Sequence, residues 1–272
     1  MKSPEDREEE ELDRLSATFH RQKAFRQGLL AGSAFLSDVG AQTPPIWGAG
    51  DEALWSAGEA LMIVGPTGVG KTTLALQIAA ARCGLLPDVF GYQVQPASQR
   101  VLYLACDRPS QIARAAKRLL GRFDPAVVDA RLWFWPGRLP ADIGRKPDAL
   151  VDFVTSADVD TVFVDSLKDV AMNLTNDDVG RTVNDGFRLC LKEGIEVCAV
   201  HHEQKKGVAG DLNAAYGSAW LTAGAGSVIQ LAGSPGARLV QLNHLKQPIS
   251  IVGPLFLEHD KGAGVFVETW QR

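Results

Sequence analysis

A glycine-rich segment between an apolar run and a helical pattern carries the residues with the clearest chemistry. It fits G-x-x-x-x-G-K-[S/T] at every fixed position and reads Gly65-Pro66-Thr67-Gly68-Val69-Gly70-Lys71-Thr72, with Thr73 next. Glycines let successive backbone N–H groups turn toward one anion, and the following helix N-terminus adds partial positive charge. Lys71 would reach the β- and γ-phosphates, and the Thr72 hydroxyl would bind Mg²⁺. The segment therefore predicts a site for a nucleoside triphosphate, with ATP and Mg²⁺ as the expected ligands.

A second acidic group is needed to hold the magnesium ion, and Asp165 is the candidate. It ends the apolar run of residues 161–164, which predicts a short buried strand. Because parallel sheets carry their ligand sites at the carboxyl ends of the strands, we expect Asp165 to lie near Thr72. The alternative interpretation is an ordinary aspartate at the end of a strand.

Two further strand ends carry polar groups that could take part in hydrolysis. Asp107 follows the strand expected at residues 101–105 and could orient the attacking water, or it could cap the next helix. His201 and His202 follow the strand expected at residues 195–200, where a neutral imidazole could sense the γ-phosphate. The alternatives for this pair are structural histidines and a metal site. The metal site is disfavoured, because no cysteine or carboxylate stands at ligand spacing.

A polar, glycine-containing segment, residues 203–211, follows the histidine pair and predicts a mobile loop. Lys205 and Lys206 within it could contact the phosphates of a nucleic-acid strand. A solvated loop explains the two lysines equally well.

Strand and helix patterns alternate from residue 59 onward. The expected strands are 60–64, 101–105, 132–135, 161–164, 195–200, 227–231 and 238–244, followed by a hairpin of 255–258 and 265–269. The expected helices are 70–81, 109–120 and 179–193. This order predicts an α/β fold: a mainly parallel twisted sheet with helices on both faces and antiparallel strands near the C-terminus.

The first part of the chain differs in composition from the rest. Residues 1–30 predict a separate N-terminal helix, acidic in its first half and basic in its second, which docks on its own domain or on a neighbouring subunit. Residues 31–58 are rich in Gly, Ala and Pro and predict an irregular connector, in which Trp47 and Trp55 are packing residues. The second domain would therefore comprise residues 31–272.

Composition narrows the class of protein. The chain has 272 residues, of which 46% are hydrophobic and 22% charged, which argues against disorder throughout. Its formal net charge of −4 gives no overall positive charge that would attract nucleic acid. A local basic channel is still compatible with this net charge, because the total does not determine how charges are distributed. The four cysteines stand in or beside apolar runs, which predicts buried thiols in a reducing compartment. No apolar run reaches the ~20 residues of a membrane span, and the N-terminus is acidic, so we expect a cytoplasmic protein without membrane contact.

Taken in order, these segments resemble a RecA-like P-loop ATPase core, and within that class the RepA-type hexameric replicative helicases. The resemblance covers about residues 45–250. Besides the glycine-rich motif, it rests on residues 55–59, 102–107, 132–136, 163–167, 200–202 and 217–219.

The resemblance implies an oligomeric ATPase, a ring hexamer or a filament, with its site between subunits. It implies that residues 203–211 face a central channel and touch single-stranded DNA. It also implies a positive side chain donated by the neighbouring subunit, for which Lys246 is the candidate. Two residues depart from the family pattern: Asp107 stands where the family has Glu, and Tyr216 where it has Arg.

The function implied is coupling of ATP binding and hydrolysis to binding or translocation on single-stranded DNA, as a helicase or a replication or recombination accessory. We see room only for the N-terminal helix beside the core, so unwinding is less strongly implied than ATP binding. The alternative is an ATP-dependent assembly switch with weak hydrolysis, which the two departures favour. A small-molecule kinase is the third interpretation, disfavoured by the order of the strands.

Overall fold

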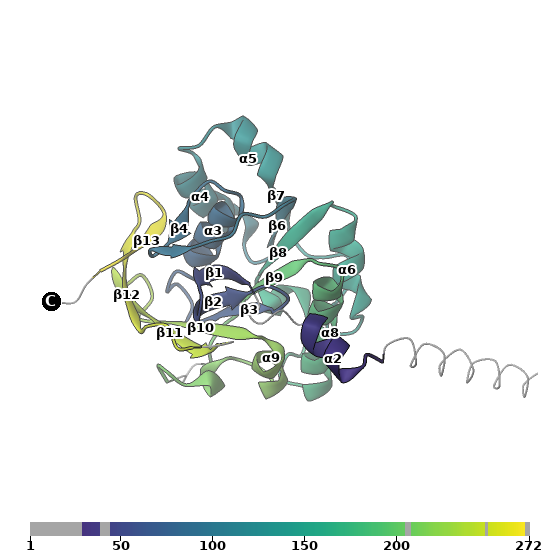
Figure 1. Ribbon diagram of the computed structural model, residues 1–272. Helices are drawn as coiled ribbons and strands as arrows, with labels where there is room; N and C mark the ends of the chain where they lie inside the picture. The colour runs from purple at the N-terminus through teal and green to yellow at the C-terminus, as the bar shows by residue number, and fades with distance from the viewer. Residues whose placement is uncertain (1–28, 39–43, 205–207, 248–249, 270–272) are drawn as a thin grey trace, which may run out of the picture. The chain divides into compact units, whose positions relative to one another are not determined.

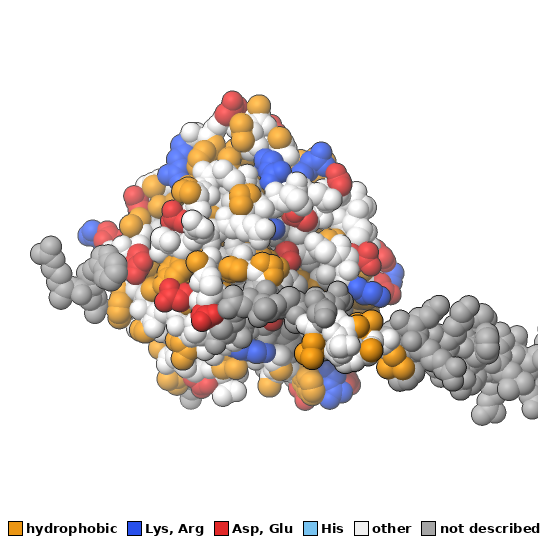
Figure 2. Space-filling view, viewed as in Figure 1, with side chains coloured by type: hydrophobic (Ala, Val, Ile, Leu, Met, Phe, Trp, Pro, Cys, Tyr) orange, Lys and Arg blue, Asp and Glu red, His pale blue; other side chains and the backbone are white. Residues whose placement is uncertain are grey.

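A computed structural model describes residues 29–38, 44–204, 208–247 and 250–269; the remainder is drawn in grey in Figures 1 and 2. The chain divides into two compact units, residues 1–43 and residues 44–272. In the first unit the described part contains one short helix, α2 (Gly32–Asp38). The helix expected over residues 1–30 lies almost wholly outside the described residues, so its existence and its docking stay predictions.

The second unit is built on a nine-stranded sheet of order β13-β12-β11-β10-β3-β9-β8-β6-β7 (Figure 1). Strands β10, β3, β9, β8, β6 and β7 run parallel, whereas β11, β12 and β13 are antiparallel to their neighbours. The strands are β3 (Leu61–Val64), β6 (Arg100–Ala105), β7 (Leu132–Pro136), β8 (Val159–Asp165), β9 (Glu196–Val200), β10 (Ser227–Ala232), β11 (Leu239–Lys246), β12 (Leu255–Asp260) and β13 (Val265–Glu268). This arrangement confirms the expected fold class.

Helices cover both faces of this sheet. Helix α3 (Lys71–Arg82) packs on β3, β6, β8 and β9, and α4 (Pro109–Leu120) packs on α3. Helix α6 (Asp148–Thr155) packs on β8, and α8 (Asp177–Lys192) packs on β9. Consecutive strand residues face opposite sides: Leu61 and Ile63 belong to one apolar cluster, and Met62 and Val64 to the other. A strand buried on both faces therefore reads as a continuous apolar run.

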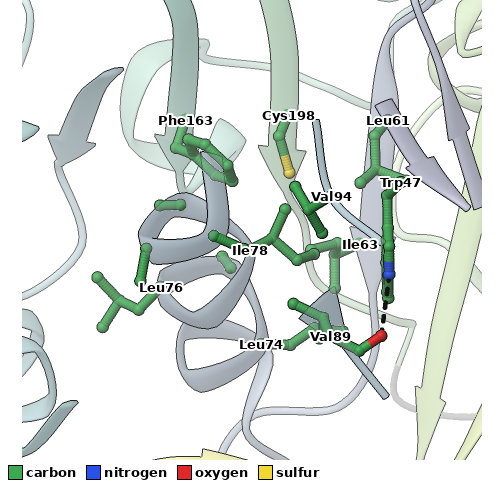
Figure 3. Close-up of a cluster of buried hydrophobic side chains, with 14 of the residues drawn as sticks. Trp47, Leu61, Ile63, Leu74, Leu76, Ile78, Val89, Val94, Phe163 and Cys198 are labelled. Carbon is green, nitrogen blue, oxygen red and sulfur yellow. Dashed lines mark hydrogen bonds between the residues drawn. The ribbon is translucent and has the colours of Figure 1, made fainter. Parts of the chain in front are cut away.

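The expected connector over residues 31–58 is wrong for its second half. Residues 45–56 form an antiparallel hairpin of β1 (Pro45–Ala49) and β2 (Glu52–Ser56). Trp47 is fully buried among apolar side chains of α3 and the central strands, and its Nε1 donates to the carbonyl of Val89 at 3.1 Å (Figure 3). Trp55 is fully buried as well, so the expectation that both are packing residues is confirmed. Two apolar runs around the Gly50–Asp51 turn signal this hairpin in the sequence.

Several short elements escape the sequence patterns. They are α5 (Pro125–Arg131), α6, α7 (Leu167–Val170), α9 (Ala219–Gly224), a 3₁₀ turn (Leu212–Ala214) and the two-residue strands β4 (Asp88–Val89) and β5 (Tyr92–Gln93). Helix α5 had a local signal, because Asp124 caps it and Pro125 takes its first position. The other helices are too short for a helical period of 3.6 residues to show in the sequence, and the two strands are too short to show alternation.

The surface and the thiols agree with the composition. The face shown in Figure 2 carries acidic and basic side chains interspersed. All four cysteines are free and buried, as expected. Within the described residues, no helix has both the length and the apolar character to cross a bilayer.

Candidate functional site

The glycine-rich loop joins the end of β3 to the start of α3. Gly65 (φ +156°) lies so close to β10 that a Cβ there would stand 2.6 Å from the carbonyl oxygen of Leu231. Gly70 (φ +110°) lies against the Phe266 ring, which a Cβ would overlap. Both positions therefore require glycine for backbone conformation and for space.

The N-terminus of α3 suits an anion. Gly70 is its N-cap, and no side chain caps the first turn. The Lys71 side chain is buried, and its Nζ donates to the carbonyls of Gly65 and Pro66, each at 2.8 Å. Burial lowers the pKa of Lys71 to about 8, against the opposing effect of Asp165. An uncapped helix N-terminus beside a buried ammonium fits a phosphate chain.

Asp165 ends β8 and lies beside the start of α3, where the sequence places it. The Thr72 hydroxyl donates to Asp165 Oδ2 at 2.8 Å, and Asp165 is 3% exposed. Burial raises the pKa of Asp165 to about 6, although the hydrogen bond from Thr72 opposes that shift. A hydroxyl oxygen and a carboxylate oxygen are suitable ligands for Mg²⁺ when waters and substrate phosphates occupy the other positions of its coordination shell. Among the described residues no three His, Cys, Asp or Glu side chains gather as a larger metal site.

Tyr103 also holds this carboxylate, and sequence reasoning missed it. Its hydroxyl donates to the same Oδ2 of Asp165 at 2.8 Å, and its ring stacks on Phe163 at 5.7 Å. Strands β6 and β8 pair Tyr103 with Phe163, so the phenol extends along the sheet toward the strand end. This contact depends on the register of two strands that are distant in sequence, which no local pattern reveals.

Asp107 enters the same region from the end of β6. Its Oδ1 lies 3.3 Å from Lys168 Nζ, and its Oδ2 lies 3.9 Å from His202 Nε2. The alternative interpretation as a helix cap is wrong, because Arg108 is the N-cap of α4 and no side chain caps that helix. Lys168, on α7 just after Asp165, is a second residue that the sequence did not reveal.

The side chains of the two adjacent histidines have different surroundings and different partners. His201 is buried, and its Nε2 donates to the carbonyl of Tyr216. His202 Nδ1 lies 3.4 Å from the Thr67 hydroxyl oxygen of the glycine-rich loop. Burial lowers the pKa of both residues to about 4, so both are neutral at pH 7. His202 is therefore placed to respond to the site, whereas His201 ties the strand end to the segment before α9.

Of the three lysines that the sequence suggested for contacts with DNA or with a neighbouring subunit, the structure describes one. Lys205 and Lys206 lie outside the described residues. Lys246 is the last residue of β11, and its Nζ donates to the carbonyl of Ala223 at 2.8 Å. It pairs with Val228, which pairs with Met62 near the start of β3, whereas the glycine-rich loop follows the other end of that strand. Lys246 thus lies at the amino ends of the parallel strands, whereas the glycine-rich loop lies at their carboxyl ends. Its role toward a neighbouring subunit stays a prediction.

These residues share one cleft of about 510 Å³. The loop and the first turn of α3 line it together with Asp107, Asp165 and His202. Sequence reasoning missed the lining residues that come from α4, from its N-cap and from β12, which are Arg108, Gln111, Ile112, Arg114, Ala115, Arg118 and His259. The volume falls within the range of small-molecule sites in proteins.

The buried histidines predict how stability depends on pH. His201, His202 and His244 have pKa values lowered to about 4 from an ordinary 6.5, chiefly by burial. Unfolding therefore takes up protons between about pH 6.5 and 4, and the free energy of unfolding falls as the pH falls through that window. Asp165 acts in the opposite sense, because its raised pKa makes the folded state bind a proton first.

Burial also lowers the pKa of His259, which adds to the effect of the other histidines, whereas burial raises the pKa of Glu59 and of Glu196, which act with Asp165. Four histidines therefore oppose three carboxyls, and the histidines of the unfolded chain take up protons already near pH 6.5. We expect the urea midpoint of unfolding to fall between pH 7 and pH 5. His244 Nε2 lies 2.8 Å from Ser227 Oγ, a contact that a glutamine amide can replace. His244→Gln should therefore flatten the pH profile. A midpoint that stays constant or rises toward pH 5 would contradict the prediction.

The chain is similar to known proteins over parts of its length. A family model described as an AAA domain matches residues 30–208. A tRNA dimethylallyltransferase from Methylobacterium sp. (strain 4-46) is 45% identical over 71 residues, 26% of this chain and 22% of the relative. Proteins of the same name from Sorangium cellulosum and Methylocella silvestris are 36% identical over 101 residues and 38% over 98 residues; each match covers 35% of this chain, and 29% and 31% of the relatives. The chain thus spans less than a third of each of these relatives.

Proposed function

Since the chain belongs to the AAA domain family, we propose that it binds ATP with Mg²⁺ at this cleft and hydrolyses it. One observation carries the proposal: the Thr72 hydroxyl and the Asp165 carboxylate meet at 2.8 Å, beside a buried Lys71 and an uncapped helix N-terminus. The three tRNA dimethylallyltransferases share at most 35% of the chain, too little to extend their activity to it.

The chain's own groups have distinct roles in this proposal. The backbone amides of the loop and Lys71 bind the phosphate chain, and Thr72 with Asp165 would hold Mg²⁺. When bound, the ion neutralises charge that develops on the phosphate oxygens. Asp107 is the candidate to accept a hydrogen bond from the attacking water and so orient it. His202, between Asp107 and Thr67, would relay the state of the γ-phosphate to the segment after β9.

We further propose that the protein forms a homo-oligomer, a ring or a filament, and couples hydrolysis to single-stranded DNA. The support is the resemblance of the ordered motifs to RepA-type helicases, together with the position of Glu203 and Gln204, the first residues of the segment 203–211, directly after His202. The segment leaves β9 directly after His202, and Glu203 pairs with Ala215 where it returns. His202 lines the cleft, so a ligand bound by this segment would contact residues that follow His202 directly in the sequence. Among the described residues on the face of Figure 2, charges of both signs are mixed, so that face adds no support.

The test is ATP turnover with and without single-stranded DNA, with Lys71→Ala as the inactive control. We expect turnover to rise several-fold on adding DNA, because contact at residues 203–211 would shift His202 and Asp107. Turnover that DNA leaves unchanged would contradict the coupling, while leaving ATP hydrolysis itself intact.

The alternative, an assembly switch with weak hydrolysis, rests on Asp107. Its side chain is one methylene shorter than the glutamate of the helicase pattern, and its Oδ1 lies 3.3 Å from Lys168 Nζ. Asp107→Glu should then raise turnover strongly, with Asp152→Glu, at an exposed position of α6, as the matched control. An unchanged rate in Asp107→Glu would favour the motor over the switch.

A further inference from the structure

The cleft has more lining residues than the binding of a phosphate chain requires. Asp107 lies 3.9 Å from His202 and 3.3 Å from Lys168, and the γ-phosphate of the proposed substrate would lie beside this group. The end of the cleft to which β12 contributes is lined by Thr73, Ala115, Arg118 and His259, which have no part in the chemistry proposed above. His259 comes from β12, which lies outside residues 30–208, so the family match assigns it nothing.

The β12–β13 hairpin is fixed firmly against this end of the cleft. The Gln77 side chain of α3 donates to the carbonyl of Phe266 at 3.1 Å and accepts from its backbone N–H at 2.9 Å. The Phe266 ring packs against Gly70 of the glycine-rich loop. At the hairpin turn, Gly264 (φ +67°) lies so close to α4 that a Cβ would stand 2.9 Å from Arg118 Cβ. The hairpin therefore bridges α3 and α4 as a rigid wall.

His259 is held in one orientation by this wall. Its ring lies 4.7 Å from the Phe266 ring, centroid to centroid, at 35°. Its Nε2 lies 3.4 Å from the Thr73 hydroxyl oxygen, one residue beyond the proposed magnesium site. The His259 ring and Arg118 line the same cleft. An imidazole ring and a planar guanidinium both stack on aromatic rings.

We propose that this end of the cleft holds the nucleoside of the bound triphosphate, with the base stacked between His259 and α4 near Arg118. The proposal rests on the proposed nucleotide site. With the γ-phosphate beside Asp107 and His202 and the chain running along Lys71 and Thr72, the ribose and base extend toward Thr73 and His259. The C-terminal hairpin thereby completes a site whose other residues come from the family-matched part of the chain. A purely structural role, packing of His259 on Phe266, is the competing explanation.

Calorimetric titration with two ligands separates these explanations: ATP, and inorganic tripolyphosphate, which has the phosphate chain without a nucleoside. We expect His259→Ala and Arg118→Ala each to weaken ATP binding roughly 5- to 100-fold, the range of base stacking on an aromatic side chain. Tripolyphosphate binding should stay within about twofold, because the loop, Lys71 and Asp165 are untouched. His259→Phe should retain most of the ATP affinity, since its ring can still stack.

Lys117→Ala is the matched control for charge, because Lys117 neighbours Arg118 on α4 but lines a different groove. It should bind both ligands as the unaltered protein does. The inference fails if His259→Ala binds ATP unchanged, or if it loses ATP and tripolyphosphate equally, which indicates a structural role. If the unaltered protein binds neither ligand, the proposed function fails together with it; if it binds both with equal affinity, only the nucleoside subsite fails.

Discussion

Lys71→Ala should abolish measurable ATP turnover while leaving the protein at least as stable as before. Loss of one positioned donor to transition-state charge typically lowers kcat by about 10²–10³-fold, and Lys71 also contributes its charge to binding. The Lys71 ammonium is buried and burial lowers its pKa, so it is poorly solvated. Removing it relieves that cost, which offsets the two hydrogen bonds that it donates to carbonyls.

The measurement combines ATP turnover, ATP affinity and the thermal unfolding temperature of the same preparations. Lys192→Ala, at the end of α8, serves as the matched control for loss of one lysine. Turnover within tenfold of the unaltered protein would contradict the role given to Lys71. A large fall in the unfolding temperature would instead show that Lys71 is mainly structural.

Asp165→Asn should lower turnover by a similar factor of about 10²–10³ and raise the thermal unfolding temperature at pH 8. The amide oxygen can still accept from the Thr72 and Tyr103 hydroxyls, so the local structure persists. Because burial raises the pKa of Asp165 to about 6, the folded state bears the cost of an ionised carboxylate above that pH. The stabilising effect of the substitution should therefore shrink toward pH 5, where Asp165 is already protonated.

Asp160 lies on the same strand and provides a control in which the pKa shift, and hence the expected change in unfolding temperature, has the opposite sign. Burial raises its pKa, but hydrogen bonds from Gln99, Ser98 and Thr161 outweigh that effect, and the pKa lies below its ordinary value. Asp160→Asn should accordingly lower the unfolding temperature and leave turnover unchanged. Equal unfolding temperatures and equal turnover in Asp165→Asn and the unaltered protein would contradict the magnesium role of Asp165.

The positions of the glycine-rich loop and Asp165 could be predicted from the sequence because each depends on local order. An apolar run sets a strand, its last residue marks the carboxyl end, and parallel strands bring these ends to one edge. Asp107 and His202 reach the cleft by the same rule. His201 could have been separated from His202 as well, because adjacent residues of an extended chain face opposite sides.

The remaining site residues depend on tertiary register, which one sequence does not display. Tyr103 reaches Asp165 only because β6 pairs with β8 in a given register. His259 reaches Thr73 only because Gln77 holds the C-terminal hairpin on α3. The first hairpin was missed for a different reason: its glycines and prolines resemble those of a connector, while its two tryptophans carry the packing.

Titration of the purified protein with ATP in the presence of Mg²⁺ tests most directly whether the Lys71 loop and Asp165 together bind a magnesium triphosphate. We predict one saturable site per chain, with affinity that falls when Mg²⁺ is removed by chelation and disappears in Lys71→Ala. Absence of any saturable binding by the unaltered protein, or binding that Lys71→Ala retains in full, would contradict the account.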